Sequence, residues 1–218
     1  MNYIVLDTET TNGFDDPFCY DVGYAVLNED FEVIETRSFV VADVFLDKEM
    51  MANAYFADKI PQYWEDIKNG VRELKTFRNI RKQLHDDCKN FEVGAIIAHN
   101  ARFDYRSCQR TQRWLTKSKY RYFFPFGCEI WDSLKMARQT FAKDEDYKNF
   151  CIENDFVMSG NRPRLTAEIL YRYLTNNVDF VESHTGLEDV MIEKEIFKAC
   201  LAMNSDIDCK TVSYTHLR

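Results

Sequence analysis

Residues 3–10 read Tyr-Ile-Val-Leu-Asp-Thr-Glu-Thr, and four residues suited to a buried strand run directly into two acids. Because successive side chains of a strand point to opposite faces, Asp7 and Glu9 project from one face, about 7 Å apart. Hard cations such as Mg²⁺ take oxygen ligands, so this acid pair is a candidate metal site. The octet alone is equally consistent with a strand end that carries two solvated acids.

The composition is that of a globular protein of one large domain. The chain has 218 residues, of which 45% are hydrophobic and 29% charged. No apolar run approaches the roughly 18 residues that a membrane helix needs, and no basic, apolar leader precedes the first strand. The seven cysteines are odd in number and scattered, which favours free thiols over disulfides or a zinc site. These features predict a soluble protein of the reducing cytoplasm.

The formal net charge of −8 argues against nucleic-acid binding by bulk electrostatics. It does not exclude a protein whose acids gather around metal ions while local basic patches hold phosphates. The most basic and aromatic stretch is 110–122, a combination that single-strand binders use. Core packing and a loop explain this stretch as well, and we favour that interpretation.

The order of strands and helices predicts an α/β fold. Strand patterns at 19–27 and 31–41 follow the first strand, which favours an antiparallel trio. The apolar run 93–98 suits an interior strand and leads into a helix over 103–117, and 128–134 predicts another strand before a further helix. We therefore expect an RNase H-like mixed sheet of about five strands, antiparallel in its first three and then parallel, flanked by helices.

The remaining segments are predicted to be mostly helical. Thr76 caps a helix with an apolar stripe, residues 46–70 are helical in composition with a break at Pro61, and 143–164 gives a weak signal. The last two helices are expected over 165–174 and 187–203. We expect one domain over residues 1–205 and a tail over 206–218 that is either frayed or foreign to the domain.

Asp189 lies on the core-facing side of the last predicted helix. The inward stripe contains Ile192 and Ile196, and three residues before Ile192 the same face carries Asp189. A carboxylate facing the core is costly unless it is paired or binds a metal. Glu188 falls about 100 degrees further round the helix, nearer the polar side. The helix dipole favours an acid in the first turn but does not explain why this one faces inward.

Two further residues are candidates for chemistry. Asp104 lies in the first turn of the helix after the strand 93–98, where ligand sites of open α/β sheets gather, although an isolated acid there is more often a helix cap. His184 lies five residues before Asp189. It is either a general base with a pKa near neutrality or a surface side chain.

Three segments resemble the exonuclease motifs of a known family. Residues 7–10 (Asp-Thr-Glu-Thr), 98–104 (Ala-His-Asn-Ala-Arg-Phe-Asp) and 184–189 (His-Thr-Gly-Leu-Glu-Asp) are similar to the first, second and third motifs of the DnaQ-like 3′–5′ exonucleases. Residues 131–138 resemble the family's segment between the second and third motifs. A histidine five positions before the last aspartate is typical of the DEDDh branch, and Thr185 excludes the branch with tyrosine.

The sequence departs from the family pattern at two places. Asn12 is an extra residue before Gly13, and Gly186 stands where the family usually has alanine. The first departure leaves three candidates for the residue that wedges the terminal base: Thr10, Thr11 and Phe14.

The resemblance implies a metal-dependent 3′–5′ exonuclease, a phosphodiester hydrolase with two divalent ions, Mg²⁺ or Mn²⁺. Asp7 would bridge both ions, Glu9 and Asp189 would hold the ion that activates water, and Asp104 would support the other. His184 would take the proton from that water. The residues that the resemblance places near the terminal nucleotide are Thr8, Thr10, Asn100 and Phe103.

The expected substrate is the 3′ end of single-stranded DNA or of a frayed duplex. RNA, including short oligoribonucleotides, is an alternative, because a contact to the 2′-hydroxyl decides between them and the sequence shows none. A second alternative is a proofreading or adaptor subunit bound to a polymerase. Processivity, the preferred metal and the oligomeric state stay open.

Overall fold

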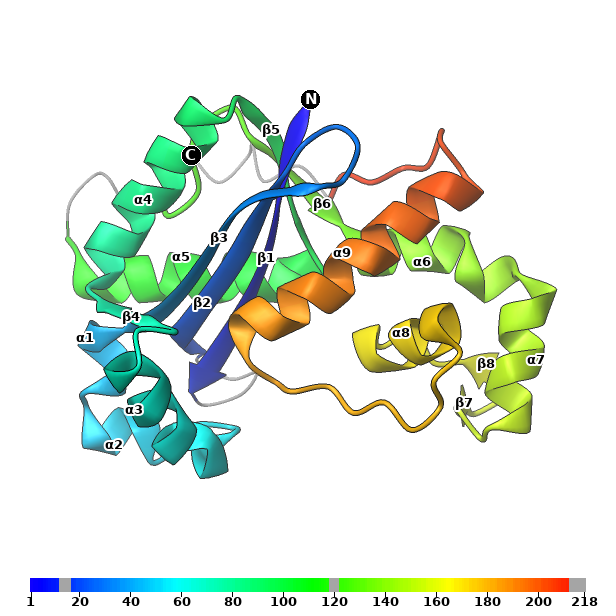
Figure 1. Cartoon of the computed structure of the whole chain (residues 1–218), viewed down its shortest axis with the longest axis horizontal. Helices are drawn as coiled ribbons and strands as arrows, with labels where there is room; N and C mark the ends of the chain where they lie inside the picture. Colours follow the sequence, from blue (N-terminus) through cyan, green and yellow to red (C-terminus); the bar gives the residue numbers. More distant parts are fainter. Residues whose placement is uncertain (12–16, 118–121, 212–218) are drawn as a thin grey trace.

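The computed structural model describes residues 1–11, 17–117 and 122–211. Its centre is a six-stranded sheet in the order β4-β3-β2-β1-β5-β6 (Figure 1). The strands β1 (Asn2–Thr11), β2 (Phe18–Leu27) and β3 (Val33–Val41) form an antiparallel trio. β5 (Val93–Ala98) runs parallel to β1, and β6 (Glu129–Asp132) runs parallel to β5. The predicted mixed sheet is confirmed.

The sheet has one strand more than expected. β4 (Glu73–Lys75) pairs in parallel with the end of β3 at the edge of the sheet. It has only three residues, too few for an alternating pattern to show in the sequence. β6 is shorter than predicted, because the Asp132 carboxylate accepts the Leu134 and Lys135 N–H groups and begins α6 (Ser133–Gln139) at once.

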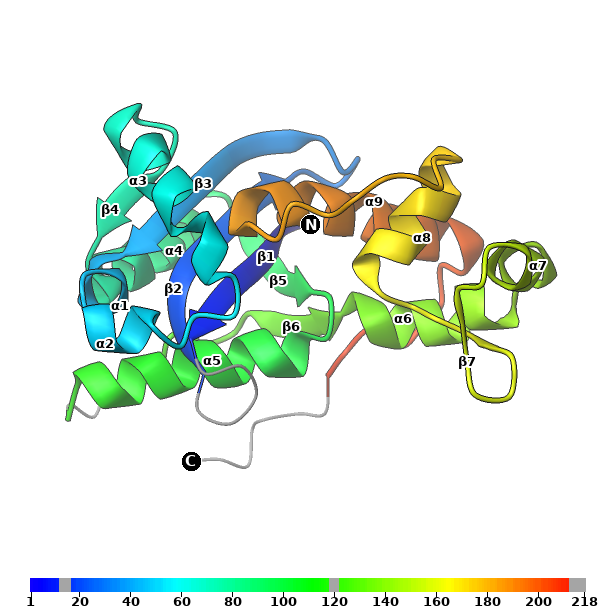
Figure 2. The ribbon, with the colours of Figure 1, turned by 90° about the horizontal axis from the view of Figure 1, so that it is seen from below.

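The two faces of the sheet carry different helices. Ile4 and Leu6 of β1 pack toward α4 (Phe77–Asn90) and α5 (Ala101–Leu115), whereas Val5 packs toward α6 and α9 (Gly186–Met203). Figure 2 shows α5 and α9 on opposite sides of the sheet. By the same alternation, Asp7 and Glu9 belong to the α9 side and Thr8 to the α5 side.

The segment between β3 and β4 is divided into short helices. Pro61 lies in the first turn of the longest of them, where its missing N–H leaves no helical hydrogen bond unmade. The break predicted at Pro61 therefore marks the start of a helix and does not interrupt a helix that is already formed. The elements here are α1 (Ala42–Phe45), α2 (Lys48–Met51), the 3₁₀ turn η1 (Ala57–Lys59) and α3 (Ile60–Lys68).

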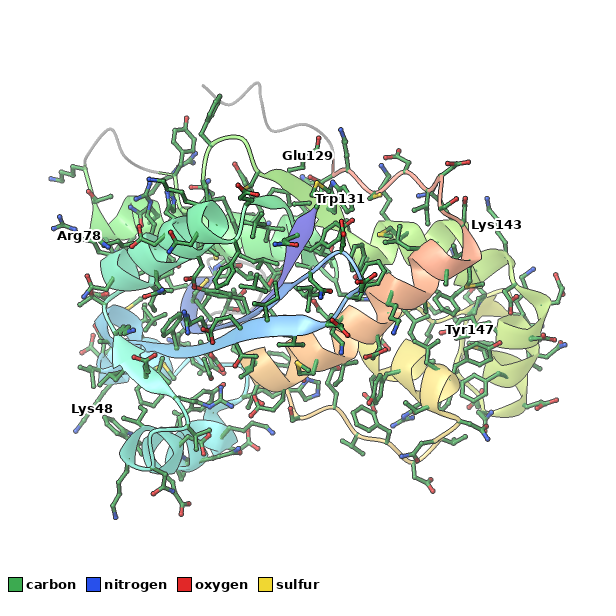
Figure 3. The ribbon with its side chains drawn as sticks, turned by 45° about the horizontal axis from the view of Figure 1, so that its top comes forward. Lys48, Arg78, Glu129, Trp131, Lys143 and Tyr147 are labelled. Carbon is green, nitrogen blue, oxygen red and sulfur yellow. The ribbon has the colours of Figure 1, made fainter. Side chains whose placement is uncertain are left out.

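The region of weak sequence signal folds beside the far end of α9. The fully buried Tyr147 of α7, labelled in Figure 3, donates its hydroxyl to the Arg164 carbonyl at 2.5 Å and joins helix to hairpin. The elements are η2 (Phe141–Lys143), α7 (Glu145–Glu153), β7 (Val157–Met158), β8 (Arg162–Pro163) and α8 (Ala167–Thr175).

The chain after α9 returns to the sheet. The Asp132 N–H donates to the Cys209 carbonyl at 2.9 Å, the Thr211 N–H donates to the Ile130 carbonyl at 3.0 Å, and Ile207 is buried. The described part of the segment 206–218, expected as a tail, thus lies along β6, near the labelled Trp131 and Glu129 (Figure 3). Residues 212–218 lie outside the described residues.

Among the described residues, no helix combines the length and the apolar character needed to cross a membrane.

Candidate metal centre

The acids of β1 lie beyond the end of the neighbouring parallel strand. β1 pairs with β5 only as far as Val5, opposite Ile97, so Asp7 and Glu9 extend past β5. The pairing with β2 shifts register between Glu9 and Thr10. Asp7 is partly exposed, and only 9% of Glu9 is exposed. Both carboxylates are therefore held at the edge of the sheet where the parallel strands end.

The first turn of α9 carries Asp189, which faces inward as its helical position predicts. The residue is 4% exposed. The Thr185 N–H donates to Oδ2 at 2.9 Å and the Ser183 hydroxyl to Oδ1 at 3.3 Å. The neighbouring Glu188 side chain is 45% exposed, in agreement with its place further round the helix. The loop before α9 thus fixes both oxygens of Asp189.

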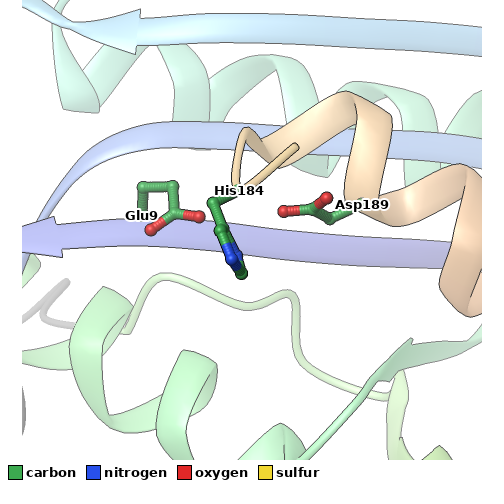
Figure 4. A group of neighbouring side chains, drawn as sticks. All are labelled: Glu9, His184 and Asp189. Atoms are coloured by element: carbon green, nitrogen blue, oxygen red, sulfur yellow. The ribbon is translucent and has the colours of Figure 1, made fainter. Parts of the chain in front are cut away.

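Glu9, His184 and Asp189 meet at one point. Each offers one ligand atom, and these atoms all lie within 4.8 Å of one another. Figure 4 shows the imidazole between the two carboxylates, which come from β1 and α9. Carboxylate oxygens and an imidazole nitrogen are ligands for divalent ions, so these residues could hold a metal ion.

Asp104 approaches the same place from the other side of β1. It lies in the first turn of α5, is 3% exposed, and accepts a hydrogen bond from the Thr8 hydroxyl at 2.9 Å. Thr8 thus ties the two elements together. The charge of Asp104 reaches both Asp7 and Glu9.

Burial raises the pKa of each of these four acids, and the charges of neighbouring acids raise it further. Burial first, then the charges of Asp21 and Asp189, raise the pKa of Glu9 to about 9. Burial raises the pKa of Asp104 and of Asp189 to about 7. The pKa of Asp7 also rises well above its usual value, through burial and then through Glu193. Such a set of largely buried carboxylates fits divalent cations, which would supply positive charge.

His184 and the residue before it are contacted by the segment that precedes α3. Its ring stacks on Phe56 with centroids 4.3 Å apart, and the Lys59 ammonium donates to the Ser183 carbonyl. His184 Nδ1 lies 3.8 Å from a Glu182 carboxylate oxygen. Burial, then the charge of Lys59, lowers the pKa of His184, so the imidazole is neutral near pH 7 and able to accept a proton.

Several solved structures of similar fold are exonucleases. Searches against protein-family models and curated proteins found no match. An exonuclease I from Methylocaldum szegediense matches at TM-score 0.59 and 16% identity, and the zinc-bound form of the E. coli ExoI–ssDNA complex at 0.58 and 16%. E. coli exonuclease I in complex with a dA16 oligonucleotide matches at 0.55 and 15%.

The chain has the exonuclease I fold. In each of these matches, 94% of the chain aligns with 41% of the other protein, so the chain spans about two fifths of their length. The fold that the three motifs imply is thus one that these exonucleases share.

The sequence has Gly186 where the motif pattern usually has alanine, and the packing of α9 on β2 explains this departure. A methyl group on Gly186 would lie 2.8 Å from the Gly23 nitrogen, and one on Gly23 would lie 2.2 Å from the Leu187 nitrogen. The start of α9 therefore touches the β2 backbone directly, which leaves no room for alanine at either position.

A buried ion network holds the start of α9 on the sheet. The Arg72 guanidinium, fully buried, donates to Asp21 at 3.2 Å, to Asp66 at 3.0 Å and to Glu188 at 2.8 Å. Asp21 in turn accepts the Gly186 N–H at 3.0 Å. The network connects β2, α3 and α9 next to Asp189.

The residues expected near the terminal nucleotide lie at the same edge of the sheet. Asn100 is exposed and has a left-handed backbone with φ of 67°, and Phe103 is partly exposed. Of the candidate wedge residues, Thr10 and Thr11 are buried, and Phe14 lies outside the described residues. In the stretch 110–122, the ring of Trp114 packs on that of Phe18 with centroids 5.1 Å apart. Residues 118–121 of this stretch lie outside the described residues.

Sequence reasoning missed Glu193, which is 4% exposed and acts on the pKa of Asp7. It lies one helical turn after Asp189 on the same face, so the spacing that indicates Asp189 would have indicated Glu193 too. Phe56 and Arg72 were also missed. No local pattern marks them, because their roles come from contacts with the distant α9 loop.

Proposed function

We propose that this chain is a metal-dependent exonuclease that removes nucleotides from the 3′ end of single-stranded DNA or of a frayed duplex. The observation that carries the proposal is the convergence of Glu9, His184 and Asp189 within 4.8 Å, beside Asp7 and Asp104, in an exonuclease fold. The DNA in the similar E. coli complexes supports DNA as the substrate.

Four acids would hold two divalent cations, Mg²⁺ or Mn²⁺, with Asp7 between the two positions. Glu9 and Asp189 would hold one of the ions, and Asp104 would support the other. When bound, such cations lower the pKa of a water molecule and stabilise phosphate oxygens that gain charge. The convergence of Glu9 and Asp189 with His184, from β1 and the loop and first turn of α9, supports the first of these positions.

His184 would act as the general base. Its neutral imidazole removes a proton from the water that attacks the terminal phosphorus, and the bond between phosphorus and the 3′ oxygen of the preceding nucleotide breaks. The products are a nucleoside 5′-monophosphate and a strand that is one nucleotide shorter. Phe56 and Lys59 keep the imidazole ring beside the acids, so the ring does not have to reorient before it accepts the proton.

The test is digestion of matched oligonucleotides labelled at either end. We expect the chain to shorten single-stranded DNA from the 3′ end with Mg²⁺ and to be inactive with chelator. Asp7→Asn and Asp189→Asn should each lower the rate by roughly 100-fold or more. Glu195→Gln is the control. Glu195 also lies on α9, but its carboxylate pairs with the Lys194 ammonium at 2.8 Å and is not part of the cluster.

Removal of nucleotides from the 5′ end, or a rate that does not respond to chelator, would contradict the proposal. Equal or faster degradation of a matched RNA would move the substrate class to oligoribonucleotides and leave the chemistry unchanged.

A further inference from the structure

The outer face of α5 carries charges of one sign only. The helix has 15 residues, and its single acid is the buried Asp104. Four exposed arginines form what we call the arginine stripe: Arg102, Arg106, Arg110 and Arg113. At 100 degrees per residue they fall within an arc of about 80 degrees, on the side of the helix opposite Asp104. Because the chain as a whole has a net charge of −8, a purely basic helix face favours an anionic partner.

Cations on other helices of the protein have acids of the same helix beside them. Lys82 pairs with Asp86 on α4 at 2.5 Å, and Lys148 pairs with Glu145 on α7 at 2.7 Å. The sequence of α5 places no acid on its outer face that could do the same. Like charges three or four residues apart on a helix repel one another, and a polyanion lying along them would remove this repulsion.

The helix runs along the edge of the sheet that carries the candidate metal centre. It begins after the end of β5, where Asp104 accepts the Thr8 hydroxyl. Two turns later, the Thr111 hydroxyl oxygen accepts the Cys19 N–H at 2.9 Å, at the start of β2. The start of β2 pairs with the end of β1, and Figure 2 shows α5 passing these strand ends. A strand whose 3′ end lies at the metal centre can therefore continue along α5.

An aromatic pair lies at the far end of the arginine stripe. The Arg110 guanidinium lies over the ring of Phe18, 5.6 Å from its centroid, and the ring of Trp114 contacts Phe18 from the same helix. Trp114 is 48% exposed. Single-strand binders combine basic side chains with exposed aromatic rings on which bases stack. The exposure of Trp114 thus favours binding over core packing for the described part of the stretch 110–122.

We propose that the arginine stripe binds phosphates of the substrate strand on the 5′ side of the cleaved bond. This inference rests on the proposed function. Arg102 and Arg113 are 11 residues apart, a distance of about 16 Å along the helix, which spans roughly five phosphates at the 3.4 Å spacing of a stacked strand. Contacts to phosphates do not depend on base sequence, and they weaken as salt displaces the strand.

The test is a double variant, Arg102→Gln with Arg113→Gln, which removes the two ends of the stripe. Fluorescence anisotropy measures its affinity for a labelled single strand of about 12 nucleotides, in chelator and over a range of salt. We expect affinity to fall by about tenfold or more at about 0.1 M salt. The slope of log affinity against log salt should become less steep by about 1.4, which is about 0.7 for each lost phosphate contact.

The matched control is Lys143→Gln with Lys198→Gln, which removes the same charge from two exposed lysines. Lys198 lies on α9, on the other side of the sheet from α5 (Figure 2). This control should bind the strand as the wild type does. An equal loss in the control would overturn the inference, because overall charge would then explain the effect.

Cleavage with Mg²⁺ provides a second readout that depends on strand length. Arg113→Gln should raise KM for the strand of about 12 nucleotides by about threefold to tenfold with little change in kcat. A dinucleotide held at the metal centre is too short to reach Arg113, so the same variant should cleave it at the wild-type rate. A similar loss on the dinucleotide would overturn the inference, because it would indicate a change at the metal centre itself.

The inference and the proposed function fail in different ways. If the wild type shortens the strand and the double variant binds it with unchanged affinity and salt slope, only the role of the arginine stripe is wrong. If the wild type does not shorten the strand, but the double variant loses affinity and salt dependence as expected, α5 binds nucleic acid and the proposed cleavage is wrong.

Discussion

The ring of Phe56 lies parallel to the imidazole of His184, with centroids 4.3 Å apart and planes inclined by 9°. His184 has a left-handed backbone with φ of 53°, which is uncommon for a residue other than glycine and persists only where surrounding contacts hold it. The stack and the hydrogen bond from Lys59 to the Ser183 carbonyl supply such contacts. The segment between α2 and α3 thus positions the proposed base.

Replacing Phe56 should therefore impair turnover more than binding. We expect Phe56→Ala to lower kcat by about tenfold to 100-fold with little change in KM, because the imidazole loses its fixed orientation. Phe56→Tyr keeps the stacked ring and should retain most of the rate. Steady-state kinetics on a short single-stranded oligonucleotide measures both constants. A rise in KM with unchanged kcat would show instead that Phe56 contacts the nucleic acid.

Removing the Arg72 guanidinium should destabilise the protein strongly. Arg72→Ala leaves Asp21 buried without its cation, and breaking a buried ion pair from one side costs about 3 kcal/mol. Urea unfolding of the metal-free protein measures this loss. The control is Lys82→Ala, since Lys82 and Asp86 form an exposed pair worth less than about 1 kcal/mol. Similar losses in both variants would mean that the buried network contributes little.

The sheet and the facing of three of the candidate site acids could be predicted from the sequence because their signals are local. Alternation places Asp7 and Glu9 on one face of β1, and helical spacing turns Asp189 inward; both features are found in the structure. The motifs also place Asp104 at the end of β5, as observed.

The rest of the site depends on contacts between segments far apart in the chain. Arg72 meets Glu188 across 116 positions, and Lys59 meets Ser183 across 124. Nothing in the sequence around Arg72 distinguishes it from a solvated surface arginine. β4 was missed for a related reason, because its three residues form a strand only by pairing with β3. Long-range packing determines these features, and periodicity does not report it.

The direct contact between α9 and β2 can be tested with a pair of glycine variants. Gly23→Ala places a methyl group against the Leu187 backbone, which cannot move without displacing α9, so we expect a loss of about 1 to 3 kcal/mol. Gly94→Ala on β5 meets only the flexible end of the Met1 side chain, which can move away. Thermal unfolding compares the two. A larger loss in Gly94→Ala would contradict this account of the Gly186 position.

Stability without metal should fall as pH rises. The folded-state pKa is about 7 for Asp104 and Asp189 and about 9 for Glu9, whereas unfolded acids titrate near pH 4. Between these values the folded chain binds more protons than the unfolded chain, so the stabilisation present at low pH is lost as pH rises through the folded-state values.

The thermal midpoint in chelator should accordingly be higher at pH 6 than at pH 8.5, and Mg²⁺ should raise it more at pH 8.5, where more of the acids are ionised to bind the ion. Asp189→Asn removes one of the titrating acids and should flatten the dependence on pH in chelator. Glu195→Gln should follow the wild type. A metal-free midpoint that rises from pH 6 to pH 8.5 would contradict this account, because it would mean that these carboxylates do not retain their protons in the folded protein.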